Sequence, residues 1–137
     1  MIQKATRILN ALGCPDAELS LLFVDDAAMR EINMEYRHQD KPTNVLSFAM
    51  HDGDFSHINP DLLGDVVIST ETAMREALEW EMDPMIRLTQ LLVHGILHLM
   101  GYDHEQGPES EAAMESKSTE LVRMLENNND LAGWLAP

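Results

Sequence analysis

Residues 94–104 constrain the fold more than any other stretch, because they place three histidines in an apolar part of the chain. The segment reads His-Gly-Ile-Leu-His-Leu-Met-Gly-Tyr-Asp-His, so the histidines are spaced by four and then six residues. A spacing of four residues places His94 and His98 on the same face of an α-helix. From Leu88 to Met100 the chain is apolar almost all round, which is typical of a buried helix. The sequence therefore predicts a central helix that carries histidines.

Both ends of this helix carry recognisable signals. Asp83-Pro84 provides an N-cap followed by a first-turn proline, and Gly101 lies where a helix end needs positive φ. The turn there can bring His104 toward the other two imidazoles. Three converging imidazoles without a fourth protein ligand are typical of a catalytic zinc site whose fourth position holds water. The alternative, hydrogen-bonded core histidines, would require polar partners for each imidazole, so the pattern favours metal binding.

The segment is also similar to the metzincin pattern H-E-x-x-H-x-x-G-x-x-H. The ligand and glycine positions of that pattern are occupied by His94, His98, Gly101 and His104. Its glutamate, the general base that acts on zinc-bound water in those peptidases, is replaced by Gly95. We therefore expect a zincin-like site with one Zn²⁺ per chain, and no peptide hydrolysis by that mechanism.

Composition limits the class of protein. The length of 137 residues predicts a single domain over residues 1–137, and no window is apolar enough for a membrane span or a signal peptide. Cys14 is the one cysteine, which excludes an internal disulfide and fits a reducing, cytoplasmic setting. The net charge of −15 argues against a broad nucleic-acid-binding surface. A polyanionic substrate would have to be held locally, by the metal and a few cations.

Helix and strand patterns interleave along the chain. We expect strands at residues 18–24, 44–50 and 63–68, the last two being antiparallel neighbours joined by a polar loop. Helices are expected at residues 2–12, from Asp25 or Asp26 to Arg37, from Ser69 or Thr70 to about Met82, at residues 84–100, and from Gly107-Pro108 onward. The sequence thus predicts an α+β fold, in which a small mixed β-sheet packs against about five helices.

Three stretches resemble the YbeY family of metal-dependent endoribonucleases. Residues 94–104 match the signature H-G-x-L-H-L-x-G-Y-D-H at each specified position. Residues 33–48 are similar to a family segment with tyrosine, arginine, aspartate, threonine and a Val-Leu-Ser-Phe strand. Residues 63–69 resemble the next strand of the family, and the three stretches lie in the family's order. One departure is Asn44, where aspartate is more usual.

The resemblance implies a single-strand-specific endoribonuclease that acts in ribosomal RNA maturation, notably at the 3′ end of the small-subunit RNA, and in ribosome quality control. It implies RNA, the small ribosomal subunit and associated factors as partners. It also implies a zinc ion held by His94, His98 and His104, and a catalytic arginine at Arg37.

Some roles stay open at this level. Arg37 could bind a phosphate or be a solvated arginine near a helix end. Asp103 and Glu105 flank His104, and either could orient an imidazole, act as a general base or be solvated. Two other function classes also remain: a metal-dependent hydrolase of a non-nucleic-acid substrate, and a non-catalytic, ribosome-associated factor with structural zinc. An open water position on the metal would favour an enzyme, and a fourth protein ligand would favour the structural alternative.

Overall fold

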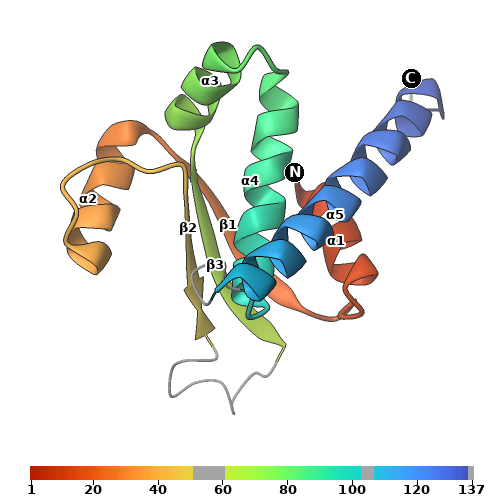
Figure 1. The fold of residues 1–137 in the computed structure, drawn as a ribbon, viewed down its shortest axis with the longest axis horizontal. Helices are drawn as coiled ribbons and strands as arrows, with labels where there is room; N and C mark the ends of the chain where they lie inside the picture. The colour runs from red at the N-terminus through yellow and green to blue at the C-terminus, as the bar shows by residue number, and fades with distance from the viewer. Residues whose placement is uncertain (51–60, 103–106, 136–137) are drawn as a thin grey trace.

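The computed structural model describes residues 1–50, 61–102 and 107–135, with side chains described up to residue 126. Five helices and three strands within this part confirm the expected α+β class with a small mixed sheet (Figure 1). Their order is α1 (Ile2–Ala11), β1 (Glu18–Val24), α2 (Asp26–Arg37), β2 (Val45–Ala49), β3 (Leu62–Ser69), α3 (Thr70–Glu79), α4 (Pro84–Leu99) and α5 (Pro108–Leu135).

The strand order is β1-β3-β2, so β3 is the central strand. β1 pairs with β3 in parallel, whereas β2 pairs with β3 antiparallel, with Val45 opposite Ile68 and Ala49 opposite Gly64. The antiparallel pairing of β2 with β3 confirms the prediction. Gly64 has φ +142°, and a Cβ at this position would collide with the backbone carbonyl of Phe48. Only glycine therefore allows β2 to approach this close to β3.

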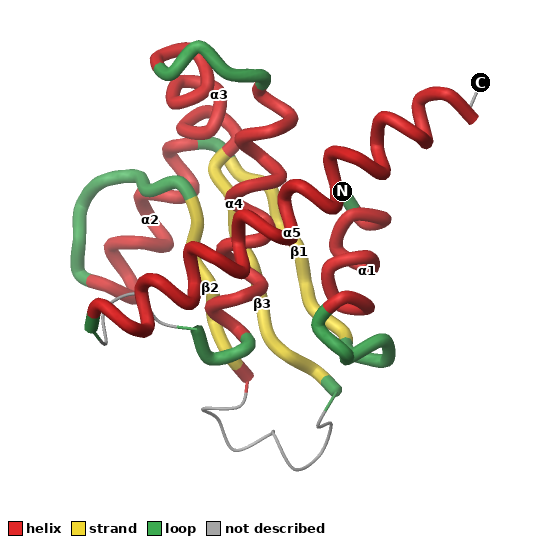
Figure 2. Tube along the Cα trace, turned by 45° about the vertical axis from the view of Figure 1, so that its right-hand side comes forward, coloured by secondary structure: helices red, strands yellow, loops and turns green. Residues whose placement is uncertain are grey.

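Different helices cover the two faces of the sheet. On one face Met29 of α2 packs against Leu46 and Val67. On the other face Val66 and Ile68 pack in one cluster with residues of α1, α3, α4 and α5. Successive side chains of a strand point to opposite faces, which is why the neighbours Val66 and Val67 belong to different layers. Figure 2 shows α5 crossing α4, so α4 lies between the sheet and an outer helix.

The helix ends test the local predictions. Asp25 caps α2, and its side chain accepts from the backbone N–H of Ala28 at 2.8 Å. α3 is capped by Ser69, but the predicted end near Met82 is wrong, because α3 ends at Glu79 and Glu81 takes a left-handed conformation with φ +54°. Among the described helices, none combines the length and apolar character of a membrane span.

Candidate metal centre and adjoining cleft

The boundaries of α4 agree with the sequence signals. The Asp83 side chain accepts from the backbone N–H of Met85 at 2.8 Å, and Pro84 is the first helical residue. At the other end Gly101 takes φ +99°, as expected for a residue just past a helix. Eight of the sixteen residues of α4 are buried. α4 is therefore a firmly packed support for the side chains it presents elsewhere.

His94 and His98 lie close together on α4, with ring centroids 6.3 Å apart and rings inclined by 41°. His94 is half-buried and His98 is exposed. Nδ1 of His98 lies 3.0 Å from the backbone carbonyl oxygen of Tyr102. An Nδ1–H that donates to this carbonyl leaves the lone pair on Nε2, which is the tautomer that a metal ligand requires.

The separation of the two rings is compatible with ligands of one zinc ion. A Zn–N bond of about 2.0–2.1 Å places the centroid of a ligand ring about 3 Å from the metal. Two such rings at a tetrahedral angle have centroids about 5 Å apart. The 6.3 Å between His94 and His98 is about 1 Å longer than this value. The donor set also fits, since neutral imidazole is a usual zinc ligand.

The third predicted ligand, His104, lies outside the described residues, as do its neighbours Asp103 and Glu105. Within the part of the chain that the structure describes, no three His, Cys, Asp or Glu side chains are grouped so that they could hold a metal ion. The described part thus contributes the pair His94 and His98. A complete centre needs a further ligand from outside it, and His104 stays the prediction for that ligand.

Gly95 lies on the side of α4 that packs against the sheet. The hydroxyl of Ser47 donates to the carbonyl oxygen of Gly95 at 2.9 Å. A Cβ at Gly95 would lie 2.6 Å from Cγ1 of Val66, which is buried and has little room to move. A glutamate at this position would enter the contact between helix and sheet. The close contact between α4 and the sheet therefore explains why the glutamate of the peptidases is absent, since it leaves no room for a side chain at Gly95.

A cleft of about 670 Å³ opens between α4 and α5, and His94 is one of its lining residues. The α4 side also includes Arg87, Gln90 and Leu91, which precede His94 by seven, four and three residues and so share its face. The α5 side is formed by Glu115, Ser118, Thr119, Val122 and Arg123. The volume lies in the range of sites for small organic ligands. The cleft therefore extends the surface around the histidines.

Arg87 is held by three neighbours. Its Nε donates to Glu76 at 3.1 Å, its Nη1 donates to Gln90 at 2.8 Å, and its Cζ lies 4.6 Å from the centre of the Trp80 ring. The amide of Asn44 also donates to Glu76, at 3.3 and 3.4 Å from the two carboxylate oxygens. Asn44 thus complements a carboxylate here, whereas the more usual aspartate would place two like charges side by side.

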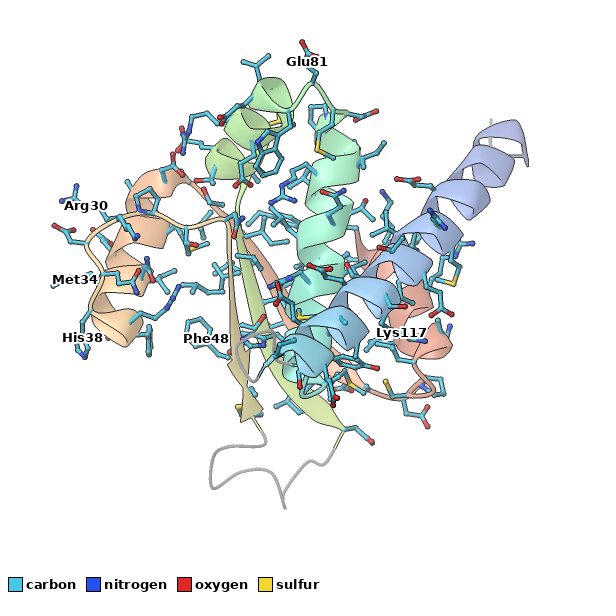
Figure 3. All side chains as sticks on the ribbon, in the orientation of Figure 1. Arg30, Met34, His38, Phe48, Glu81 and Lys117 are labelled. Carbon is cyan, nitrogen blue, oxygen red and sulfur yellow. The ribbon has the colours of Figure 1, made fainter. Side chains whose placement is uncertain are left out.

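Arg37, the predicted phosphate-binding residue, is the last residue of α2 and is exposed. The ring of the preceding Tyr36 packs against Phe48 at a centroid distance of 4.9 Å, and Figure 3 shows this end of α2, marked by His38, on the Phe48 side of β2. Arg37 does not line the cleft beside His94, and no ion pair joins it to another described residue. The structure brings the two histidines together but places Arg37 across the edge of the sheet, so its catalytic role stays a prediction.

Apart from His94, the residues that line the cleft were not identified as site residues from the sequence. On α4 a signal existed, because Arg87 and Gln90 precede His94 at helical spacing. No such signal existed for Arg123, since only the fold places α5 beside α4.

The chain is similar to proteins of one family over most of its length. The family model described as Endoribonuclease YbeY matches residues 1–126. A protein named Endoribonuclease YbeY from Geobacter metallireducens is 54% identical over 123 residues, which are 89% of this chain and 82% of that protein. Another from Syntrophotalea carbinolica is 54% identical over 122 residues, 88% of this chain and 81% of that protein. The solution structure of TM1509 from Thermotoga maritima has a TM-score of 0.64 at 27% identity, covering 88% of this chain and 75% of that one. The chain therefore belongs to the YbeY family.

Proposed function

We propose that this protein is a zinc-dependent, single-strand-specific endoribonuclease that acts in ribosomal RNA maturation, at the 3′ end of the small-subunit RNA, and in ribosome quality control. Membership of the YbeY family supports hydrolysis of RNA phosphodiester bonds. The observation that carries the metal chemistry is the paired arrangement of His94 and His98 on α4, with Nδ1 of His98 at the Tyr102 carbonyl. RNA and the small ribosomal subunit are its proposed partners.

One zinc ion per chain would be held by His94, His98 and His104. When bound, such an ion polarises a phosphate oxygen and activates water. The contribution of the chain is orientation: buried α4 holds two imidazoles four residues apart, and the Tyr102 carbonyl fixes the ring of His98. In this sense residues 1–137 form one zincin-like domain, with the histidine helix packed on a mixed sheet.

Arg37 is the proposed cation for a phosphate near the scissile bond. The protein carries 9 basic and 24 acidic residues, so few cations are available for RNA. Arg37 is exposed beside the outer strand β2, where its guanidinium can form a bidentate contact with a phosphate. An extended RNA strand that passes this edge can contact Arg37 with one phosphate and α4 with another.

A cytoplasmic location is part of the proposal. Cys14 is a free, half-buried cysteine, and burial raises the pKa of its thiol. A protonated thiol is a poor nucleophile and is slow to oxidise, which suits a residue without redox function.

The test compares the zinc-loaded wild-type protein with His98→Ala on structured ribosomal RNA and on matched single-stranded and duplex oligonucleotides. The wild type should cleave single-stranded RNA and leave duplex RNA intact. His98→Ala should retain less than about a tenth of an equivalent of zinc and cleave at least about a thousandfold more slowly. Cleavage by metal-free His98→Ala at the wild-type rate would contradict the role of the metal.

A second set of variants tests Arg37. Arg37→Glu should keep zinc and melting temperature but lose cleavage, whereas Arg37→Lys should be partly active because the bidentate fork is lost. Arg7→Glu makes the same charge change on α1 and should leave cleavage nearly unchanged. Near wild-type cleavage by Arg37→Glu with zinc retained would remove Arg37 from the mechanism.

A further inference from the structure

We propose that the cleft between α4 and α5 is a subsite for the nucleotide next to the scissile phosphate of single-stranded RNA, with Arg123 as its phosphate contact. This inference rests on the proposed function, because it takes RNA as the ligand. The cleft begins at a predicted metal ligand, since His94 lines it. A phosphodiester bound at the histidines would therefore have the cleft beside it.

The cleft follows one face of α4. From His94 to Arg87 it covers seven residues, which correspond to about 10 Å along the helix. α5 crosses α4 in this region (Figure 2). Side chains of α5 supply the opposite wall of the cleft. The result is a short groove that leads away from the histidines toward the start of α4. A flexible single strand can enter such a groove.

The lining has the mixed chemistry of a nucleotide site. Leu91, Val122 and Val45 provide an apolar wall against which the face of a base can pack. The hydroxyls of Ser118 and Thr119 provide hydrogen-bond donors and acceptors for a sugar or a phosphate. An inorganic phosphate alone would leave the apolar wall in water, and a wholly apolar ligand would desolvate the polar groups without replacing their hydrogen bonds.

Two arginines line the groove, and Arg123 is the one that can contact a phosphate, because the charge of Arg87 is already paired with Glu76. Arg123 is exposed, and no ion pair connects it with another residue in the described part of the chain. Arg87 is only 14% exposed and is held by Glu76, so its guanidinium is fixed before a ligand arrives. A fixed group loses little conformational entropy when a ligand binds.

The groove also contains one acidic residue. Glu115 precedes Arg123 by eight residues on α5, which is about 12 Å along the helix. A phosphate at Arg123 is therefore well separated from this carboxylate. Glu115 should nevertheless weaken the binding of RNA slightly, because it adds a like charge to the site.

The experiment measures binding of a short, fluorescein-labelled single-stranded RNA to metal-free protein by anisotropy at several salt concentrations. Arg123→Gln should raise Kd by about five- to tenfold. It should also make the slope of the logarithm of the association constant against log salt less negative by about 0.7, the value for one phosphate contact on a single strand. Arg7→Gln, the same charge change outside the cleft, should leave both unchanged. Glu115→Gln should bind about twofold more tightly.

Cleavage by the zinc-loaded variants separates the subsite from the nuclease function. Arg123→Gln should raise KM while kcat stays near the wild-type value, because it loses binding and not chemistry. Suppose that the wild type cleaves RNA, but that Arg123→Gln has the same Kd, salt slope and KM as the wild type and Arg7→Gln. The subsite is then wrong, and the proposed function stands. If the wild type does not cleave but Arg123→Gln selectively weakens binding, the subsite stands and the nuclease function falls. No measurable binding of RNA by the wild type would overturn the subsite.

Discussion

The two faces of α4 make different demands on their residues. Toward the sheet, Gly95 is in such close contact with Val66 that no side-chain atom can be added without displacement. Toward the cleft, Gln90 and His94 are half-buried, and His98 is exposed. The packed face fixes the position of the helix, and the other face presents side chains that can change without repacking the core. Substitutions on the two faces should therefore separate stability from activity.

In the metal-free protein the largest expected effect is on the packed face. Gly95→Leu should lower the free energy of unfolding by more than about 3 kcal/mol, since it overfills a buried contact. Gln90→Ala, on the cleft face, should lower it by less than about 1 kcal/mol. Urea unfolding followed by circular dichroism gives both values. A Gly95→Leu protein with a wild-type unfolding midpoint would break the comparison.

Removal of the metal should lower the stability of the protein through the histidines on the cleft face alone. Zinc at a thousandfold excess over Kd should stabilise the wild type by about 4 kcal/mol, and chelation should reverse this. His98→Ala should lose the zinc effect while its metal-free stability stays within about 1 kcal/mol of the wild type, because His98 is exposed. Thermal melting with zinc and with chelator measures both. A zinc-dependent rise in Tm for His98→Ala equal to that of the wild type would contradict the assignment.

A third region, the contact between α2 and α3, is held by a cluster of polar side chains around Asp26. The Asp26 carboxylate accepts from Arg75 at 2.6 Å, Thr72 at 2.5 Å and Ser69 at 2.7 Å, which ties α2 to α3. These hydrogen bonds, that of Arg75 above all, lower the pKa of Asp26 to about 2. Because this value lies below that of the unfolded chain, about 3.9, the stabilisation is present above pH 4 and is lost as the pH falls toward 2.

Asp26→Asn should remove this pH dependence. Between pH 4 and pH 2 the urea midpoint of the wild type should fall more steeply than that of the variant. Parallel falls of the two midpoints would show that Asp26 has no linked stability. Such a result would leave packing, and not this polar cluster, as the connection between α2 and α3.

The smallest effect is expected at Asn44. Asn44→Asp would place a second carboxylate beside Glu76 and should lower stability by less than about 1 kcal/mol at pH 7. The difference from wild type should shrink at about 1 M salt, which screens the repulsion between the two carboxylates. Asn44→Ala loses the hydrogen bond without adding charge and should show no such change. Thermal melting of the three proteins at low and at high salt tests this, and equal differences at the two salt concentrations would contradict it.

The sequence alone predicted the boundaries of α4, because the residues that determine them lie within the helix or at its ends. Asp83-Pro84, the histidine spacing and Gly101 lie within one helix and its two ends, and the structure confirms its boundaries. The end of α3 had no such signal, because Glu81 takes positive φ without being a glycine. The cleft could not be predicted, since only tertiary packing brings α5 beside α4.

The most direct test of the metal centre follows all six histidines of the chain by long-range ¹H–¹⁵N NMR during a zinc titration of the metal-free protein. The account predicts saturation at about one equivalent of zinc, with changes in the imidazole nitrogens of His94, His98 and His104. His98 should be protonated at Nδ1 before and after zinc is added. The signal of His38, which lies at the end of α2, should stay in place and serve as an internal control. Saturation at a different stoichiometry, or shifts that leave His94 and His98 unchanged, would contradict a metal centre on α4.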